Sequence, residues 1–172
     1  MARCFAGTVL LEGTTLSEGR GTTVPLEVVG APDIHVNPIL ATMHSLAEDW
    51  LQGAYLRPCY FEPTFHKHQG KLCEGFQIHA QHRDYQPHLF KPFRLIVLFL
   101  KALRQHYPDY ALWRSHGYEY ETRLPIDLIN GGTRIREWID DPTATVGDLE
   151  VYLRRDEKAW SENLSGCLLY PG

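Results

Sequence analysis

The chain has 172 residues, of which 44% are hydrophobic and 22% are charged, and its formal net charge is −4. This length and composition fit one ordinary globular domain with a substantial core, and the slight acidity argues against nucleic-acid binding, which normally needs a basic surface. No apolar run approaches the ~20 residues of a membrane-spanning helix, so the sequence predicts neither a nucleic-acid partner nor a membrane partner.

The amino-terminal stretch and the cysteines point to no processing signal and no disulfide scaffold. The stretch MARCFAGTVLLEG holds one arginine and a broken apolar run that ends at Glu12, so we expect no secretory signal within it. The cysteines form no C-x-x-C pair and no zinc-ribbon spacing. Free thiols are therefore expected at all four positions, which are Cys4, Cys59, Cys73 and Cys167.

Apolar residues recur at helical spacing in two long stretches of the first hundred or so residues. The first stretch runs from Asn37 to Gln52, where Asn37 suits an N-cap and Gly53 suits the end of the helix. The second runs from Pro92 to His106 and is apolar nearly all round. Such a pattern is typical of a buried central helix.

Two further helices are predicted near the carboxyl end. A short helix is expected from Thr133 to Asp140, before Pro142. A longer one is expected from Gly147 to Asn163, with Thr145 as its N-cap and Asp148 three residues further on.

Two stretches favour β-strands, Tyr55 to Phe61 and Gly75 to His82. In the second, Phe76 and Ile78 alternate with polar residues, as expected for a strand with one buried face. Since strands and helices alternate only loosely, the predicted class is α/β (α+β), as a single compact domain with a small mixed sheet packed by several helices.

A group of imidazole and thiol side chains raises the question of a metal site: His66, His68, Cys73, His79 and His82. Such ligands suit zinc, but in a strand His79 and His82 point to opposite faces and cannot share one ion. We therefore expect no metal and no cofactor.

The stretch EGTTLSEGRGTT, from Glu12 to Thr23, carries two carboxylates and one guanidinium among glycines and short hydroxyl residues. Glycosidases use two carboxyl groups ~5 to 9.5 Å apart, whereas an extended chain would hold Glu12 and Glu18 about 20 Å apart. Separate roles are more plausible, with one carboxylate binding a ligand and the other pairing Arg20. The side chains suit a sugar that bears an acid group, and a solvated loop is the alternative.

The loop PTFHKHQGKLCEG also carries charged and polar side chains, with Lys67 and Lys71 as its cations, and there a charged surface turn is the alternative.

Several linked motifs resemble one family. EGTTLSEGRGTT, PLEVVGAP (residues 25–32), RPCYFEPTFHKHQGKLCEGFQIHA (57–80) and the closing CLLYPG (167–172) are similar in order to the exo-β-N-acetylmuramidase family, also called NamZ. Its members are bacterial peptidoglycan-recycling glycoside hydrolases. The resemblance covers essentially the whole chain.

The resemblance implies that residues 1–172 are a C-terminal auxiliary domain. The N-terminal Rossmann-like domain, which carries the catalytic carboxylate, would lie outside this chain, and the active site would lie between the two. The complete enzyme would release N-acetylmuramic acid from the non-reducing ends of peptidoglycan fragments. Two alternatives remain: a non-catalytic module that binds muramyl sugars, and an interaction domain that docks on a separate catalytic chain. Self-association through a face left uncovered is also expected.

By position, the resemblance also implies the residues of the sugar-binding wall. Arg20 or Lys67 would pair the lactyl carboxylate of the sugar. The full set is Glu12, Thr14, Ser17, Glu18, Arg20, Gly21, Thr22, Thr64, Lys67 and Cys73. No catalytic residue is assigned within the chain.

The chain departs from the family pattern at a few positions, so its substrate preference is expected to differ from the family norm. Thr15 stands where asparagine is usual, Leu26 where phenylalanine is common, and His66 where serine is common. Asp33 and the pair Gln81-His82 also depart from the pattern.

Overall fold

The structure is a computed structural model that describes residues 1–81, 83, 85–115, 122–164 and 167. The chain divides into two compact units, Met1–Asp140 and Asp141–Gly172. No helix among the described residues is both long enough and apolar enough to span a membrane.

The first unit contains a three-stranded sheet formed by β1 (Val28–Ala31), β2 (Tyr55–Phe61) and β3 (Cys73–His79). The strand order is β1-β3-β2, and β3 pairs antiparallel with both neighbours. The expected mixed α and β class is confirmed, and the sheet is antiparallel rather than mixed. The range predicted for β2 is confirmed. The strand expected to end at His82 ends at His79, and His82 itself lies outside the described residues.

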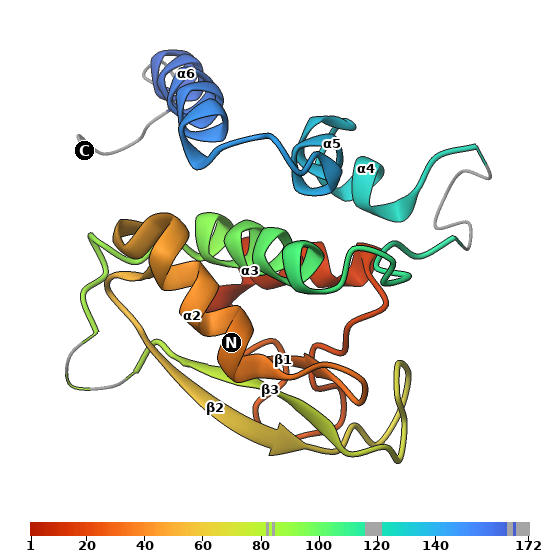
Figure 1. The fold of residues 1–172 in the computed structure, drawn as a ribbon. Coiled ribbons are helices and arrows are strands. Elements are labelled where there is room, and N and C mark those ends of the chain that lie inside the picture. The colour runs from red at the N-terminus through yellow and green to blue at the C-terminus, as the bar shows by residue number, and fades with distance from the viewer. Residues whose placement is uncertain (82, 84, 116–121, 165–166, 168–172) are drawn as a thin grey trace. The chain divides into compact units, whose positions relative to one another are not determined.

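Helices cover one face of this sheet, where α2 (Val36–Ala47) and α3 (Pro92–His106) lie against it in Figure 1. Phe76 of β3 meets Phe99 of α3 edge to face, with ring centroids 5.0 Å apart. Every residue of α3 from Arg94 to Leu103 is buried, which confirms the predicted central helix and its bounds. The core of this unit therefore lies between the sheet and α3.

The remaining elements of this unit pack around α3 and its neighbours. The helix α1 contacts α3 and η1, α4 contacts η1, and α5 contacts α3. On the α5 side, buried Lys101 donates a 2.7 Å hydrogen bond to the carbonyl oxygen of Trp138. The bounds are α1 (Ala2–Thr8), η1 (Val9–Gly13), η2 (Glu48–Leu51), α4 (Pro125–Ile129) and α5 (Arg134–Asp140).

The helix predicted for residues 37–52 is correct in place but not in its ends. It begins at Val36, because the Glu74 carboxylate of β3 accepts a hydrogen bond from the Val36 backbone amide at 2.7 Å. A tertiary contact thus caps the helix where a local cap by Asn37 was expected. After Ala47 the chain tightens into η2, and it turns at Gly53 with a φ of 85°.

The second unit is built on α6 (Val146–Leu164). Its start is the predicted capping box: the Asp148 carboxylate accepts from the Thr145 backbone amide at 2.8 Å, and Asp148 N–H donates to the Thr145 hydroxyl at 3.3 Å. These bonds satisfy amide groups that would otherwise be unpaired at the first turn.

Candidate functional site

The stretch Glu12 to Thr23 is fixed to its neighbours on both sides. Ser17 and Gly30 of β1 exchange backbone hydrogen bonds of 2.9 and 3.1 Å. On the other side, Thr15 N–H donates to Leu112 O at 2.8 Å and Arg114 N–H donates to Gly13 O at 3.1 Å. The stretch is therefore a pinned part of the fold and not a solvated linker.

The loop between β2 and β3 docks on this stretch at Gly21. The Thr64 backbone amide donates to Arg20 O at 3.1 Å. Gly21 has a φ of 79°, and a Cβ atom there would lie only 1.8 Å from the Thr64 hydroxyl. Only glycine meets both conditions, so Gly21 allows the two predicted motifs to come together.

Four charged side chains from the two motifs form the Glu18 cluster, defined as Glu12, Glu18, Arg20 and Lys67. Arg20 bridges both carboxylates, with its Nε paired to Glu18 and its Nη2 lying 2.9 Å from Oε1 of Glu12. Lys67 Nζ lies 2.7 Å from Oε2 of Glu18. The turn at Gly19, with a φ of 72°, lies between Glu18 and Arg20. Only one carboxylate was expected to pair Arg20, and both do.

Glu18 is the centre of this cluster and its side chain is only 1% exposed. Burial opposes its ionisation, but the charge of Lys67 and the contacts with Lys67 and Arg20 outweigh it, so its pKa lies below the usual value. Oε2 has the Lys67 ammonium beside it as an ion pair but has no partner with hydrogen-bond geometry. A ligand cannot reach this carboxylate without displacing its neighbours.

Lys67 is held from several directions. Its ammonium donates to the carbonyl oxygens of Leu11 at 2.7 Å and Thr14 at 3.3 Å, besides its ion pair with Glu18. Burial lowers the pKa of Lys67 more than the charge of Glu18 raises it. The neighbours His66 and His68 both have positive φ angles, of 70° and 58°. Such backbone is unfavourable for residues other than glycine and needs surrounding contacts to persist.

A hollow of about 400 Å³ opens over the cluster, lined by Thr15, His66, Lys67, His68 and Arg114. We call it the Lys67 hollow. The pKa values of both histidines lie below the usual value, chiefly because of burial, so both rings are neutral at pH 7. Within the described part of the chain, no carboxylate lines this hollow.

Arg114 was not predicted from the sequence. Its Nη1 donates to Glu12 O at 3.0 Å, across 102 residues of chain. The backbone of residues 112–114 runs beside residues 13–15, which places its guanidinium at the hollow. No motif surrounds this arginine, so only the long-range pairing identifies it.

The predicted wall residues occupy three kinds of position. Lys67 lines the hollow. Thr14, Ser17 and Cys73 are buried and do not line it. Thr14 Oγ1 donates to Leu11 O at 2.9 Å, and Ser17 Oγ accepts from Gly19 N–H at 3.1 Å. The remaining residues, Glu12, Glu18, Arg20, Gly21, Thr22 and Thr64, form or support the charged cluster and the turn beside it.

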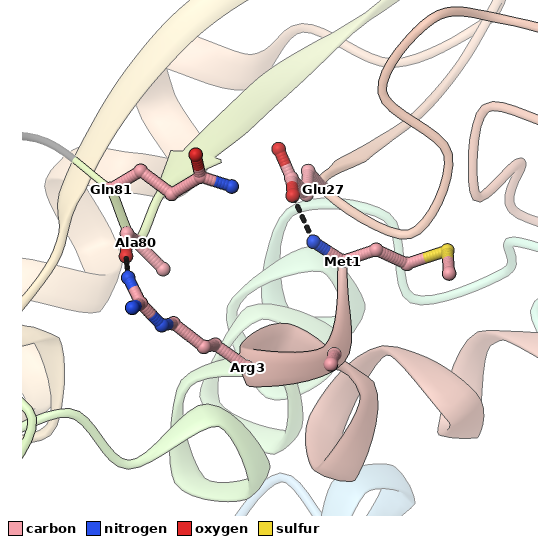
Figure 2. Close-up of a pocket in the computed structure, with 6 residues that line it drawn as sticks. Met1, Arg3, Glu27, Ala80 and Gln81 are labelled. Atoms are coloured by element: carbon pink, nitrogen blue, oxygen red, sulfur yellow. Dashed lines mark hydrogen bonds and ion pairs between the residues drawn. The ribbon is translucent and has the colours of Figure 1, made fainter.

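Two other hollows involve none of the predicted residues. One, of about 540 Å³, lies between the amino terminus and the end of β3 (Figure 2). There the Met1 ammonium pairs with Glu27 and Arg3 donates to Ala80 O at 2.6 Å, so the polar groups satisfy one another. The other, of about 630 Å³, lies beside α4 and α5, where Arg136 binds both carboxylate oxygens of Asp127 at 2.8 and 3.0 Å.

Among the histidines that the structure describes, His66 and His68 line the Lys67 hollow, whereas His79 binds Arg57 on the sheet. Arg57 donates to Gln77 Oε1 at 2.8 Å and to His79 Nε2 at 3.1 Å, which places Gln77 and His79 on the same face of β3 as predicted. In the residues that the structure describes, no three His, Cys, Asp or Glu side chains are grouped as metal ligands would be.

Comparison with known proteins gives a consistent result across the chain. Residues 3–170 match the family model described as "Exo-beta-N-acetylmuramidase NamZ, C-terminal". A curated relative from Bacillus subtilis (strain 168), the peptidoglycan β-N-acetylmuramidase NamZ, is 34% identical over 148 residues. The match covers 86% of this chain and 32% of the relative, so the chain spans about a third of that protein's length.

Two crystal structures of DUF1343 family proteins from Bacteroides fragilis NCTC 9343 share the fold. Each superimposes with a TM-score of 0.63, at 20% and 19% sequence identity. They cover 91% and 98% of this chain, which in turn covers 41% and 40% of theirs.

Proposed function

Because the chain belongs to the family of the NamZ exo-β-N-acetylmuramidase C-terminal domain, we propose that it is the C-terminal part of a longer exo-acting glycoside hydrolase. In that enzyme it forms one wall of the cleft that binds N-acetylmuramic acid at the non-reducing end of peptidoglycan fragments. The parent protein serves bacterial cell-wall recycling, and it acts in the cytoplasm or outside the membrane.

The observation that carries this proposal is the composition of the Lys67 hollow. Its lining offers one hydroxyl, two imidazoles, one lysine and one arginine, which suit the hydroxyl and acid groups of a muramyl sugar. Glycoside hydrolysis needs carboxyl groups beside the scissile bond, and none of the lining residues supplies one. This fits a wall that binds the sugar while the rest of the enzyme cleaves it.

The proposed division of labour follows from burial. Glu18 positions Lys67 and Arg20 from beneath, since its carboxylate is enclosed by them. Lys67, Thr15 and Arg114 face the hollow and are placed to contact the sugar. In the complete enzyme, a carboxylic acid from the N-terminal half protonates the leaving oxygen while water or an anion attacks the anomeric carbon.

Two residues of the Lys67 hollow support a substrate preference that differs from the family norm. Thr15 and His66 are two of the departures from the family pattern, and both line it. Threonine reaches less far than asparagine, and histidine is bulkier than serine. We propose that these two side chains reshape the hollow for a sugar that differs from the family's usual one.

A surface for the N-terminal half is proposed on the same loop as Lys67. Phe65 and Leu72 are 53% and 62% exposed there, and apolar side chains exposed beside a binding site are typical of a docking surface. In isolation this surface would favour self-association. Two other roles remain as alternatives, a carbohydrate-binding module and an interaction domain for a separate catalytic chain.

The test is an activity assay with and without the N-terminal half, supplied as a fusion or as a second chain. We expect release of N-acetylmuramic acid from a muramyl glycoside only when both parts are present. Release by the 172 residues alone would contradict the proposal, as would unchanged activity of the complete enzyme after deletion of this part.

Calorimetry with N-acetylmuramic acid separates the two alternatives. Binding by the isolated chain, without any cleavage after the N-terminal half is added, would favour the carbohydrate-binding module. If the isolated chain does not bind N-acetylmuramic acid but binds tightly to a separately encoded half, the interaction domain would be favoured.

A further inference from the structure

We infer that Arg114 recognises the acid group of the sugar, so that the Lys67 hollow selects an acidic sugar over a neutral one. The inference rests on the proposed function and adds to it the residue that determines specificity. It starts from the balance of charge among the residues around the hollow.

The Glu18 cluster is neutral as a whole. Its two carboxylates, Glu12 and Glu18, face two cations, Arg20 and Lys67, at ion-pair distance. Opposite charges so placed largely cancel one another. Arg114 adds a further positive charge that these ion pairs do not balance, and its guanidinium donates to the neutral backbone carbonyl of Glu12.

The other cations near the hollow are less available to a ligand. Arg20 pairs with Glu18 through Nε and with Glu12 through Nη2, and it does not line the hollow. Lys67 lines it, but its ammonium already serves Glu18 and the carbonyl oxygens of Leu11 and Thr14. An ammonium has three N–H donors, and two of them go to these carbonyl oxygens while its charge is paired with Glu18.

The Arg114 guanidinium has N–H donors beyond the one that binds Glu12 O. A guanidinium has five N–H donors in a planar fork that matches a carboxylate, and the bond from Nη1 to Glu12 O fixes its orientation while using one of them. The neighbouring imidazoles are neutral at pH 7 and can accept or donate hydrogen bonds to hydroxyl groups. Arg114 is thus placed to bind the anion while Thr15, His66 and His68 surround the rest of the sugar.

The experiment compares two ligands in the complete two-part enzyme: a muramyl glycoside with its free lactyl carboxylate, and the same compound with that carboxylate converted to an amide. For the parent enzyme we expect kcat/KM for the acid to exceed that for the amide by about tenfold or more, as for other charge-assisted bonds. In Arg114→Gln the preference should disappear, through a higher KM for the acid and little change for the amide.

Two further variants separate recognition from folding. Arg114→Lys keeps the charge but loses the fork, so an intermediate preference is expected. Lys71→Gln removes an exposed cation of the loop between β2 and β3. Lys71 does not line the hollow, so this variant should keep the preference for the acid. Melting temperatures of all variants would show whether the fold survives, and a ratio of two substrates measured on one folded sample does not depend on its concentration.

The outcomes distinguish the two levels of the argument. If the parent enzyme acts on neither compound, the proposed function fails. If it prefers the acid and Arg114→Gln keeps that preference, the role of Arg114 is wrong although the proposed function stands. Equal losses for acid and amide in Arg114→Gln would also overturn the inference, because they would show a purely structural role.

Discussion

The Lys67 ammonium lies 2.7 Å from Oε2 of Glu18, a carboxylate whose side chain is 1% exposed and which Arg20 holds from its other oxygen. Lys67 comes from the loop between β2 and β3, and Glu18 comes from the stretch before β1. This buried pair therefore joins the two loops that define the site. Its removal should affect both stability and the shape of the hollow.

Glu18→Gln should lower the free energy of unfolding by about 3–5 kcal/mol, because it leaves the buried Lys67 ammonium without its counter-charge. Urea unfolding measures the loss. Glu62→Gln is the matched control, since Glu62 is an exposed glutamate at the start of the same loop, and it should change stability by less than about 0.5 kcal/mol. The double variant Glu18→Gln/Lys67→Met should recover part of the lost stability, because it removes both charges. Equal effects of Glu18→Gln and Glu62→Gln would show that the pair is not buried in solution.

Stability should fall on acidification, and Glu18 should account for part of the fall. Its pKa is lowered in the folded state, so its contribution is complete above the usual carboxyl pKa of about 4.3 and is lost as the pH falls through the lower folded value. Unfolding free energies measured between pH 3 and 7 should therefore decline more steeply in the parent chain than in Glu18→Gln. Parallel curves for the two proteins would contradict the low pKa assigned to Glu18.

Gly21→Ala should be more harmful than Gly70→Ala, although both glycines have positive φ angles, of 79° and 68°. Backbone strain alone costs about 1–2 kcal/mol at either position. At Gly21 the added methyl group also meets the Thr64 hydroxyl at 1.8 Å, whereas nothing lies within 4 Å at Gly70. Thermal unfolding of the two variants compares the costs directly, and a similar decrease in Tm for both would show that the loops do not touch as described.

Alkylation of the thiols should follow burial. Cys4 and Cys73 are buried, and burial raises the pKa of each thiol to about 11, so few of them are reactive thiolates at pH 8. Cys167 is exposed and should be labelled first by iodoacetamide in the native protein, as peptide mass spectrometry can measure. Labelling of Cys73 as fast as Cys167 would place the start of β3 at the surface.

The sequence was most informative where a pattern is local. The periodicity of residues 92–106 predicted α3 with its observed bounds, the strand predicted for residues 55–61 is β2, and the Thr145–Asp148 box predicted the start of α6. Periodic apolar spacing and capping residues act within a few positions of one another. The free thiols were also predicted correctly from spacing alone.

Elements that depend on distant partners were missed or displaced. The strand β1 has only four residues, all buried, too few for alternation to identify it, and the short helices α1 and α4 show no long stripe. The start of α2 depends on Glu74, which is 38 residues away. The residues around Val36 do not indicate a contact with a side chain so far away in the sequence.

The site was predicted in part for the same reason. Two motifs supplied Glu18, Arg20 and Lys67, but an extended-chain distance gave no sign that one guanidinium would bridge Glu12 and Glu18. Arg114 lies 102 residues from the carbonyl that it binds. A prediction of either feature requires the fold.

The most direct test of the account is a titration of the isotope-labelled chain, bound to its N-terminal half, with N-acetylmuramic acid by amide NMR. We predict that the largest chemical-shift changes fall on the residues of the Lys67 hollow, which are Thr15, His66, Lys67, His68 and Arg114. Changes confined to the hollow beside Met1, Arg3 and Glu27, or no changes in a complex that cleaves its substrate, would contradict the claim that this hollow holds the sugar.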